Sequence, residues 1–413
     1  MSAIGAVGAP RAAAALSAGL VTMMAVAMFI NYADRGSLSV AAPVLTDQLK
    51  ISNSQMGLLL SAFFWSYAAA HPLAGAIAQR FNVRWVMAIG LTLWAGATAL
   101  CGLATTFVAL LALRLLVGLG ESVIFPANAR ILSEHAPDHQ RGAANGVTLL
   151  GQFLGPTAGT LAGGLILARF GWPWVFFALG GLSLLWLFPW LTMRLGIPPR
   201  RDRPAPVRPP SYAAMLSQRA LWSASLGHFC YAYTHYLLLT WLPLYLVKGL
   251  HYSLAQMGLI GAAIFGVQSV GALTSGWVSD QAVRRGAPAP RVRKLTILCG
   301  IAGVMISTGL IGVLPQSMVL PWLFAAGFSN GATSTMVFTI GQTLGGPTAG
   351  ARWIGVQNMF GQFAGIGAPI VTGILLERTG AFSITFQVAS GLSAIGFLIW
   401  AFLVPRIEPV RWP

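Results

Sequence analysis

The sequence GWVSDQAVRR at residues 276–285 is the first indication of the fold, because a related sequence occurs once more in the chain. Residues 75–84 read GAIAQRFNVR, with the glycine and basic residues at similar places, and each copy follows a long apolar run. A second pair, GQFLGP at 151–156 and GQFAG at 361–365, is separated by a similar distance of about half the chain. Such a parallel duplication is typical of transporters built from two six-helix halves.

The composition places these apolar runs in a membrane. Of the 413 residues, 56% are hydrophobic and only 8% are charged, whereas soluble domains carry roughly 25% charged residues. A membrane-spanning helix needs about 20 apolar residues, and runs of that length recur from end to end. We therefore predict an all-α membrane protein with twelve transmembrane helices in two pseudo-symmetric six-helix bundles.

The predicted spans divide evenly about a polar, proline- and arginine-rich segment in the middle of the chain. They are residues 17–44, 54–79, 83–104, 107–133, 142–168, 173–195, 220–247, 253–280, 294–314, 318–343, 353–377 and 382–404. The predicted domains are an N-terminal bundle at 1–195, a cytoplasmic linker at 196–219 and a C-terminal bundle at 220–413.

The net charge of +16 comes from short clusters between the apolar runs, not from a basic folded domain. With the N-terminus placed inside, the inside segments hold 19 of the 25 Lys and Arg residues and the outside loops hold 4. The remaining two lie within spans. This asymmetry follows the positive-inside rule. It predicts a multi-pass membrane protein with both termini cytoplasmic, and it argues against a nucleic-acid partner.

Neither an enzyme nor a metal site is indicated by the sequence. Cys101, Cys230 and Cys299 lie in apolar segments, and no metal-type spacing occurs. The sequence contains neither a phosphate-cradling glycine–lysine motif nor a soluble catalytic domain. The first 17 residues hold one Arg and no convincing hydrophobic signal core, so we expect the first span itself to direct insertion.

Four charged residues lie deep within predicted spans: Asp34, Arg35, Arg114 and Glu121. A charge at the membrane centre costs at least about 2.5–3.5 kcal/mol on insertion scales, so such groups face a cavity or a partner. Arg114 and Glu121 are two helical turns apart on one face, about 10 Å along the axis. Each can therefore meet a ligand or a group from the first helix. Asp34 and Arg35 are adjacent, so their side chains diverge by about 100°.

The chemistry of these groups suggests a role for each. A guanidinium stays charged and offers a planar fork that fits a carboxylate, so we predict that Arg35 binds a substrate anion. Burial disfavours the charged form of a carboxyl group, so Asp34 and Glu121 are the predicted proton carriers. The alternative is an ion-pair cluster that only holds the first and fourth spans together, which would not exclude transport.

The Gly-x-x-x-Asp-x-x-x-Arg-Arg pattern of residues 276–285 resembles the loop signature of the major facilitator superfamily. The first-half copy departs from it, because Gln79 stands where the family has Asp, so a charge-based latch in the N-terminal half does not follow. Within the superfamily the chain resembles the anion:cation symporters, and among them the bacterial galactonate-type sugar-acid/proton symporters. The segments that carry this resemblance are NYADR at 31–35, residues 114–130, residues 142–156 and IGVQN at 354–358.

This resemblance implies a set of functional residues. It implies the roles given above for Asp34, Arg35 and Glu121, and it suggests that Arg114 stabilises a nearby acid in one conformation and releases it in another. Tyr32, Tyr67 and Gln152 match polar positions that contact substrate in galactonate-type relatives; the alternative for each is a bond between helices. The candidate gating residues are Gly75, Arg80, Gly276, Asp280, Arg284 and Arg285.

Further candidates lie in the second half of the chain. Tyr231, His235 and Tyr236 in the seventh span either line the cavity opposite Arg35 or pack against neighbouring helices. His235 is a candidate proton relay or a hydrogen-bonded structural group. Asn358 in the eleventh span is a candidate substrate contact.

We predict a proton-coupled symporter that imports a small organic anion, a sugar acid or another monocarboxylate, by alternating access. The alternative is an organic-anion exchanger or a drug-type efflux antiporter, because Gly142, Gly151, Gly155, Pro156 and Gly159 reproduce most of the spacing associated with drug antiporters. We expect protons as the coupling ion, no cofactor and no metal. The expected partners are the anion and the lipid bilayer, with the protein a monomer. A hydroxyl-rich acid and an aromatic or short aliphatic acid both remain open as substrates.

Overall fold

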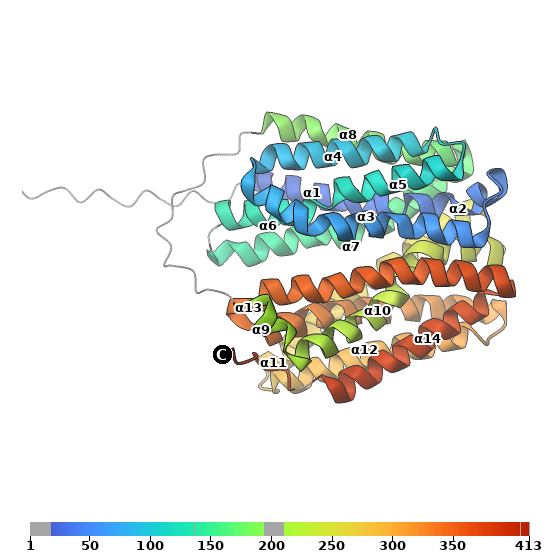
Figure 1. Ribbon diagram of the computed structural model, residues 1–413. Helices are drawn as coiled ribbons and strands as arrows, with labels where there is room; N and C mark the ends of the chain where they lie inside the picture. The colour runs from blue at the N-terminus through green and yellow to red at the C-terminus, as the bar shows by residue number, and fades with distance from the viewer. Residues whose placement is uncertain (1–17, 137, 194–209, 405, 413) are drawn as a thin grey trace, which may run out of the picture.

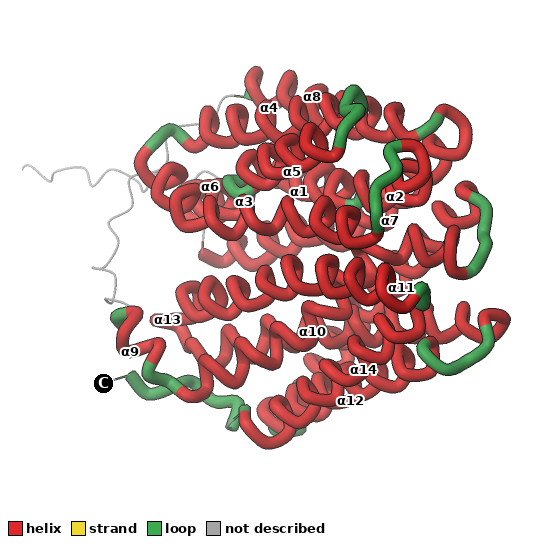
Figure 2. Tube along the Cα trace, turned by 45° about the vertical axis from the view of Figure 1, so that its right-hand side comes forward, coloured by secondary structure: helices red, strands yellow, loops and turns green. Residues whose placement is uncertain are grey.

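A computed structural model describes residues 18–136, 138–193, 210–404 and 406–412 as helices joined by short loops (Figure 1). These ranges contain no β-strand. The helices of residues 18–193 pack into one bundle and those of residues 210–412 into another, and the two bundles lie side by side (Figures 1 and 2). Most of the predicted linker, residues 196–209, lies outside the described ranges.

Six long segments make up the N-terminal bundle. They are α1 (Ala18–Arg35) with α2 (Ser37–Gln48), α3 (Asn53–Arg80), α4 (Val83–Cys101), α5 (Phe107–Glu121) with α6 (Ile124–His135), α7 (Asp138–Phe170) and α8 (Trp172–Thr192). The first and fourth predicted spans are each broken by a short turn. One break is at Gly36, and the other is at Ser122 and Val123, so both breaks directly follow a charged residue of the predicted site.

The C-terminal bundle also has six long segments. They are α10 (Arg219–Leu244) continuing as the π-helical turn η1 (Tyr245–Gly249), α11 (Leu254–Arg284), α12 (Ala289–Ile311), the two arms of α13 (Val319–Thr379), and α14 (Phe382–Leu398) continuing as η3 (Ile399–Leu403). The short α9 (Tyr212–Leu216) and η2 (Gln316–Met318) lie in connections. The arms of α13 meet at Gly346, whose φ of 63° suits glycine. The tenth and eleventh predicted spans are the two arms.

Eight of the described helical segments are long and apolar enough to cross a membrane. The other four long segments are α1 with α2, α3, α10 and the arm of α13 before Gly346. Three of these carry most of the predicted polar site, including Arg35 in α1, Tyr67 in α3 and His235 in α10. These less apolar segments bring polar groups to the interior, where such groups face a cavity or a partner. The other two interior charges, Arg114 and Glu121, lie in α5, within one of the eight apolar segments.

The sequence duplication also appears in the way two helices begin. Ser52 caps α3 and Ser253 caps α11, each through a capping box with a glutamine three residues later. In both boxes the serine Oγ accepts from the backbone N–H of the glutamine at 3.3 Å, and the glutamine side chain accepts from the serine N–H at 3.0 Å. The repeat predicted from the loops therefore extends to SNSQMG at 52–57 and SLAQMG at 253–258.

The bundles contact each other through helix pairs that the duplication relates, α3 with α13 and α11 with α7. Glycines allow this close approach: a Cβ added to Gly57 would lie 2.5 Å from the carbonyl oxygen of Pro369. A Cβ added to Gly164 would lie 2.4 Å from Cα of Gly258. These contacts lie toward the end of the molecule formed by residues 45–53, 245–254, 312–318 and 377–383, which we call the Asp47 end. The opposite end, where residues 193 and 210 flank the linker, is the linker end (Figure 1).

Candidate functional site

Glu121 ends α5 in the interior of the N-terminal bundle, and two glycines before it explain how it gets there. A Cβ added to Gly118 would lie 2.3 Å from the carbonyl oxygen of Phe63, and one added to Gly120 would lie 2.6 Å from the backbone nitrogen of Trp94. Small residues let membrane helices approach closely. Therefore α5 lies directly against α3 and α4, and the Glu121 carboxylate is fully buried.

Arg35 and Glu121 form a buried ion pair that joins α1 to α5. The Arg35 Nε atom donates to Glu121 Oε2 at 2.8 Å, and the side chains are 4% and 0% exposed. The Arg35 guanidinium carbon lies 4.3 Å from the ring centroid of Tyr32 and 5.0 Å from those of Phe63 and Tyr67. These distances allow cation–π attraction. Arg35 Nη2 and Glu121 Oε1 are buried without a hydrogen-bond partner, so each member of the pair keeps an unused polar atom.

Asp34 points to a different helix from its neighbour. Its Oδ2 atom accepts a hydrogen bond from Thr98 Oγ1 in α4 at 2.7 Å, while Oδ1 is buried without a partner. Thr98 was not among the sequence candidates, because a threonine in an apolar helix more often bonds to its own helix backbone. The two carboxylates are thus held by different partners, Asp34 by a hydroxyl and Glu121 by a guanidinium.

Arg114 lies in the same interior without an ion-pair partner in the described residues. Its side chain is buried, and its Nε and Nη1 atoms have no hydrogen-bond partner. Its guanidinium carbon lies 5.7 Å from the ring centroid of Phe63, the ring that also flanks Arg35. Two cationic side chains therefore share one aromatic ring, and two acids lie among them.

The C-terminal bundle offers neutral polar groups in its interior. His235 of α10 lies between Gln268 of α11 and Asn330 of α13: the Gln268 side-chain nitrogen is 3.0 Å from His235 Nδ1 and 3.1 Å from Asn330 Oδ1. On the next residue of α10, the Tyr236 hydroxyl donates to Gln362 Oε1 at 3.2 Å. Gln268, Asn330 and Gln362 were not predicted, because uncharged amides within a span are weaker signals than charges.

A contact between aromatic rings connects the two bundles at the site. The Phe64 ring of α3 meets the Tyr236 ring edge to face, with centroids 4.6 Å apart. Phe64 also packs against Phe63, whose ring lies beside Arg35. Tyr236 in turn packs against His235, with ring centroids 5.2 Å apart. The structure therefore brings Arg35, Tyr32, Tyr67, Tyr236 and His235 into one continuous region.

Other predicted residues lie at the edge of this region or away from it. Gln152 in α7 and Asn358 in α13 are partly buried, and neither side chain makes a hydrogen bond within the described residues. Tyr231 is buried and stacks on His235, with ring centroids 6.1 Å apart.

The predicted gating residues lie toward the linker end, and four of them are exposed: Arg80, Asp280, Arg284 and Arg285. Gly75 and Gly276 are partly buried. In the N-terminal bundle, Arg130 of α6 donates to the carbonyl oxygens of Ala78 and Phe81 at the end of α3 and pairs with Glu134 at 2.7 Å. Arg130 therefore binds the end of α3 in the half where Gln79 replaces the acid of the loop signature.

The Asp47 end carries interactions between the bundles that were not predicted. Lys248 pairs with Asp47, and Glu377 Oε2 accepts from Ser52 Oγ at 3.0 Å and from the backbone N–H of Ser54 at 2.7 Å. Deeper in the interface, Ser39 Oγ donates to the carbonyl oxygen of Thr240 at 2.7 Å. The sequence does not show which charged loop residues of one half contact those of the other half, so these interactions could not be predicted.

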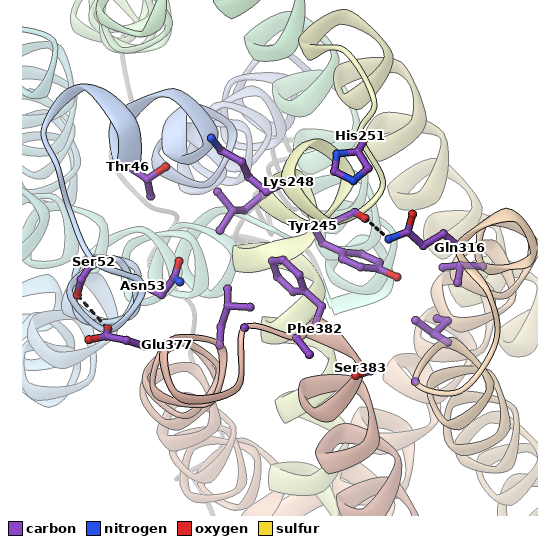
Figure 3. Close-up of a pocket in the computed structure, with 18 of the residues that line it drawn as sticks. Thr46, Ser52, Asn53, Tyr245, Lys248, His251, Gln316, Glu377, Phe382 and Ser383 are labelled. Carbon is purple, nitrogen blue, oxygen red and sulfur yellow. Dashed lines mark hydrogen bonds between the residues drawn. The ribbon is translucent and has the colours of Figure 1, made fainter.

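The charged residues of these contacts, Asp47, Lys248 and Glu377, border a cavity of about 960 Å³ at the Asp47 end (Figure 3). Thr46, Ser52, Lys248, His251 and Glu377 are among the residues around it, and Gln316 donates to the Gly249 carbonyl oxygen at 2.9 Å on its far side. None of the site residues predicted from the sequence lines this cavity. The large cavity and the charged interior are therefore separate features.

Residues 24–369 match the family model of the Major Facilitator Superfamily. The chain belongs to this superfamily. The twelve-helix, two-bundle prediction is confirmed, and this major facilitator protein is a multi-pass membrane protein that serves transport and not enzymatic catalysis.

Similar proteins are known from bacteria and plants. The chain is 29% identical over 418 residues to "D-galactonate transporter" of Escherichia coli, covering 94% of the chain and 96% of that protein. It is 28% identical over 387 residues to "Ascorbate transporter, chloroplastic" of Arabidopsis thaliana, covering 89% of the chain and 71% of that protein. The solved structure of a bacterial homologue of the human lysosomal transporter Spinster has a TM-score of 0.75 at 20% identity, with 94% of each chain covered. It shares the fold of this major facilitator protein.

Proposed function

We propose that this chain is a proton-coupled symporter that imports a small organic anion, a sugar acid or another monocarboxylate, by alternating access. The observation that carries the proposal is the buried Arg35–Glu121 pair, with one unused polar atom on each partner. A guanidinium fork fits a carboxylate. The relatives that are named for galactonate and ascorbate support an organic acid as the substrate.

Coupling follows from competition for Arg35. While Glu121 is ionised, its carboxylate neutralises Arg35 and occupies Nε. A proton on Glu121 removes that charge and leaves the guanidinium to a substrate carboxylate, so anion and proton enter the site together. Asp34 is the second proposed carrier, because it is buried nearby with an unpaired Oδ1 atom. Arg114 is proposed to stabilise the ionised form of one of these acids in one conformation.

Alternating access requires that the two ends open in turn. In this conformation the interactions of Asp47, Lys248 and Glu377 hold the Asp47 end together. We propose that the site is then reached from the linker end. The loop residues predicted for gating, Gly75 and Arg80 in one half and Gly276 through Arg285 in the other, lie toward that end and would hold it closed in the opposite conformation.

The proposed location is the bacterial inner membrane, with the linker end and both termini in the cytoplasm. The distribution of Lys and Arg supports this orientation. Reporter fusions placed after Arg208 and after Arg411 should both give cytoplasmic signals. A periplasmic signal from either fusion would contradict the orientation.

An exchanger or efflux antiporter remains the second candidate, on the glycine–proline spacing in α7. In the structure these glycines serve packing: added Cβ atoms at Gly151, Gly155 and Gly159 would lie 2.4–2.7 Å from backbone carbonyl oxygens of α1. The surroundings of Gly142 lie outside what the structure describes. Close approach of α7 to α1 accounts for the spacing without a drug antiporter, so the symport proposal is favoured.

The experiment that tests the function is uptake into proteoliposomes with D-galactonate and with ascorbate as probes. A proton-coupled symporter should accumulate one of these acids when the outside is made acidic, and a protonophore should abolish the accumulation. Accumulation that needs a preloaded anion and ignores the pH gradient would establish exchange instead. Failure of both probes under every gradient would contradict the proposed substrate class.

A further inference from the structure

The side chains of His235, Gln268 and Asn330 in the C-terminal bundle form a cluster that engages one nitrogen of the imidazole. The Gln268 side-chain nitrogen lies 3.0 Å from His235 Nδ1 and 3.1 Å from Asn330 Oδ1, and His235 Nδ1 lies 3.3 Å from Asn330 Oδ1. The Nδ1 atom is therefore engaged by these two amides in either tautomer of the ring. The other ring nitrogen, Nε2, is left for a different partner.

This arrangement leaves two nitrogen atoms without a partner. His235 Nε2 makes no hydrogen bond within the described residues, and the His235 side chain is only partly buried. Asn330 is fully buried, and its Nδ2 atom also has no partner. A buried polar group that is left unpaired costs roughly 1–3 kcal/mol. A water molecule or a ligand oxygen removes this cost.

The two nitrogens lie in the region that contains Arg35. The path of ring contacts runs from Arg35 through Phe63, Phe64 and Tyr236 to His235, with successive separations of 5.0, 5.0, 4.6 and 5.2 Å. Arg35, with its unused Nη2 atom, is at one end of this path, and His235, in contact with Asn330, is at the other. A small molecule that bridges the two bundles would contact Arg35 with one end and His235 with the other.

The surroundings of Arg35 in the N-terminal bundle are charged, whereas those of His235 in the C-terminal bundle are neutral. This difference limits which ligand groups can bind beside His235. Every Lys and Arg of the described C-terminal half lies near a helix end or near Gly346, so none lies beside His235. A second carboxylate on this side would be buried without a cation, which is strongly unfavourable. The matching group is a neutral oxygen, such as a hydroxyl or a carbonyl.

We infer that His235, positioned by Gln268 and Asn330, binds a neutral oxygen of the substrate and selects hydroxylated or oxo monocarboxylates over simple fatty acids. This inference rests on the proposed function for the carboxylate at Arg35. It adds His235 as the side chain that distinguishes substrate acids of equal length and charge. A site that hydrogen-bonds a substrate hydroxyl discriminates strongly against an analogue that lacks it.

The test compares two six-carbon monocarboxylates, D-galactonate and hexanoate, by isothermal titration calorimetry with the purified full-length protein. The wild type should bind D-galactonate at least about tenfold more tightly than hexanoate. His235→Phe should remove most of this ratio, and Gln268→Leu should reduce it by freeing the imidazole. His235→Gln should retain part of it, since the amide keeps a donor.

His228→Phe is the matched control. His228 is also a buried histidine of α10, but it packs against Phe338, with ring centroids 5.4 Å apart, and its Nδ1 atom has no partner. This change should leave the ratio unaltered. An equal affinity of the wild type for both acids would overturn the inference, as would a wild-type ratio in folded His235→Phe. If His235→Phe does not fold, His235→Gln and Gln268→Leu take its place. Wild-type affinity ratios in both of these folded variants would also overturn the inference.

The outcomes separate this inference from the proposed function. Arg35→Lys should weaken both acids by the same factor, because it acts on the carboxylate that they share. If the affinity ratios are as expected but no pH-driven accumulation occurs, the symport proposal fails and the inference about His235 stands. Proton-driven accumulation with an unchanged ratio in His235→Phe would defeat the inference alone.

Discussion

The two bundles share one architecture but differ in the chemistry of their interiors. The N-terminal interior holds four ionisable charges, Asp34, Arg35, Arg114 and Glu121, whereas the described C-terminal interior holds His235, Gln268, Asn330 and Gln362. A duplicated fold thus carries charge in one half and neutral hydrogen bonding in the other. We propose that the N-terminal half carries the proton and binds the substrate carboxylate, while the C-terminal half binds the other polar groups of the substrate.

The same asymmetry appears at the Asp47 end. Both α3 and α11 begin with a serine–glutamine capping box, but within the described residues only the α3 box also meets an acid from the other bundle, Glu377. The signals that begin the two helices are therefore alike, whereas the contacts that the two helices make with the opposite bundle differ.

The largest expected effect comes from breaking the charged interior. Glu121→Leu leaves Arg35 buried and unpaired, so the free energy of unfolding should fall by about 3–5 kcal/mol. The double variant Arg35→Leu/Glu121→Leu should recover much of that loss, because no isolated charge remains. Chemical denaturation in detergent measures both. Equal losses in the single and double variants would show that the pair does not act as a unit.

The second effect concerns the anion ligand. Arg35→Lys keeps the charge but loses the fork, so binding of the transported carboxylate should weaken tenfold or more, about 1.4 kcal/mol. Arg378→Lys, at an exposed arginine of α13, is the control and should bind as the wild type does. Unchanged affinity in a folded Arg35→Lys protein would remove Arg35 from the site.

A smaller effect should distinguish the two matched caps. Ser52→Ala and Ser253→Ala each remove a cap worth about 1 kcal/mol of stability, but only Ser52→Ala also loses the bond to Glu377. Spin labels at Lys50→Cys and Gln316→Cys, in a Cys299→Ser background, report the separation of the bundles at the Asp47 end. Ser52→Ala should raise the population with the longer distance.

Ser253→Ala should leave that distance distribution unchanged, although it lowers stability to a similar extent. The same response from both variants would mean that cap loss, and not the bond between the bundles, controls this end of the molecule.

The smallest effect belongs to the neutral interior. Tyr236→Phe removes the hydroxyl that donates to Gln362, and a hydrogen bond between membrane helices contributes about 0.6 kcal/mol on average. The loss of stability should therefore be several times smaller than in Glu121→Leu, measured in the same denaturation experiment. A loss as large as that of Glu121→Leu would contradict the contrast between the bundles.

Much of the fold followed from the sequence, because apolar length, loop charge and the GWVSDQAVRR repeat are local signals. The breaks at Gly36 and Gly346 did not, since glycine is common inside membrane helices and only the backbone conformation shows a turn. The charged residues of the site were found because a charge within a span is rare. An ion-pair cluster between the first and fourth spans was the stated alternative, but the sequence did not show that Arg35 pairs with Glu121, because this depends on how α1 and α5 rotate about their axes. Gln268 and Asn330 were missed because a neutral amide in a span resembles a structural bond.

Replacing each buried acid by its amide tests whether these acids couple protons to transport. Glu121→Gln and Asp34→Asn mimic the protonated acids, and an amide oxygen can still accept from Arg35 or Thr98. Each variant is reconstituted and compared with the wild type for substrate exchange and for accumulation driven by a pH gradient, with melting temperature as the control. We predict that both variants fold and exchange substrate but do not accumulate it against a gradient. Wild-type accumulation in both variants would show that these acids do not couple protons to transport.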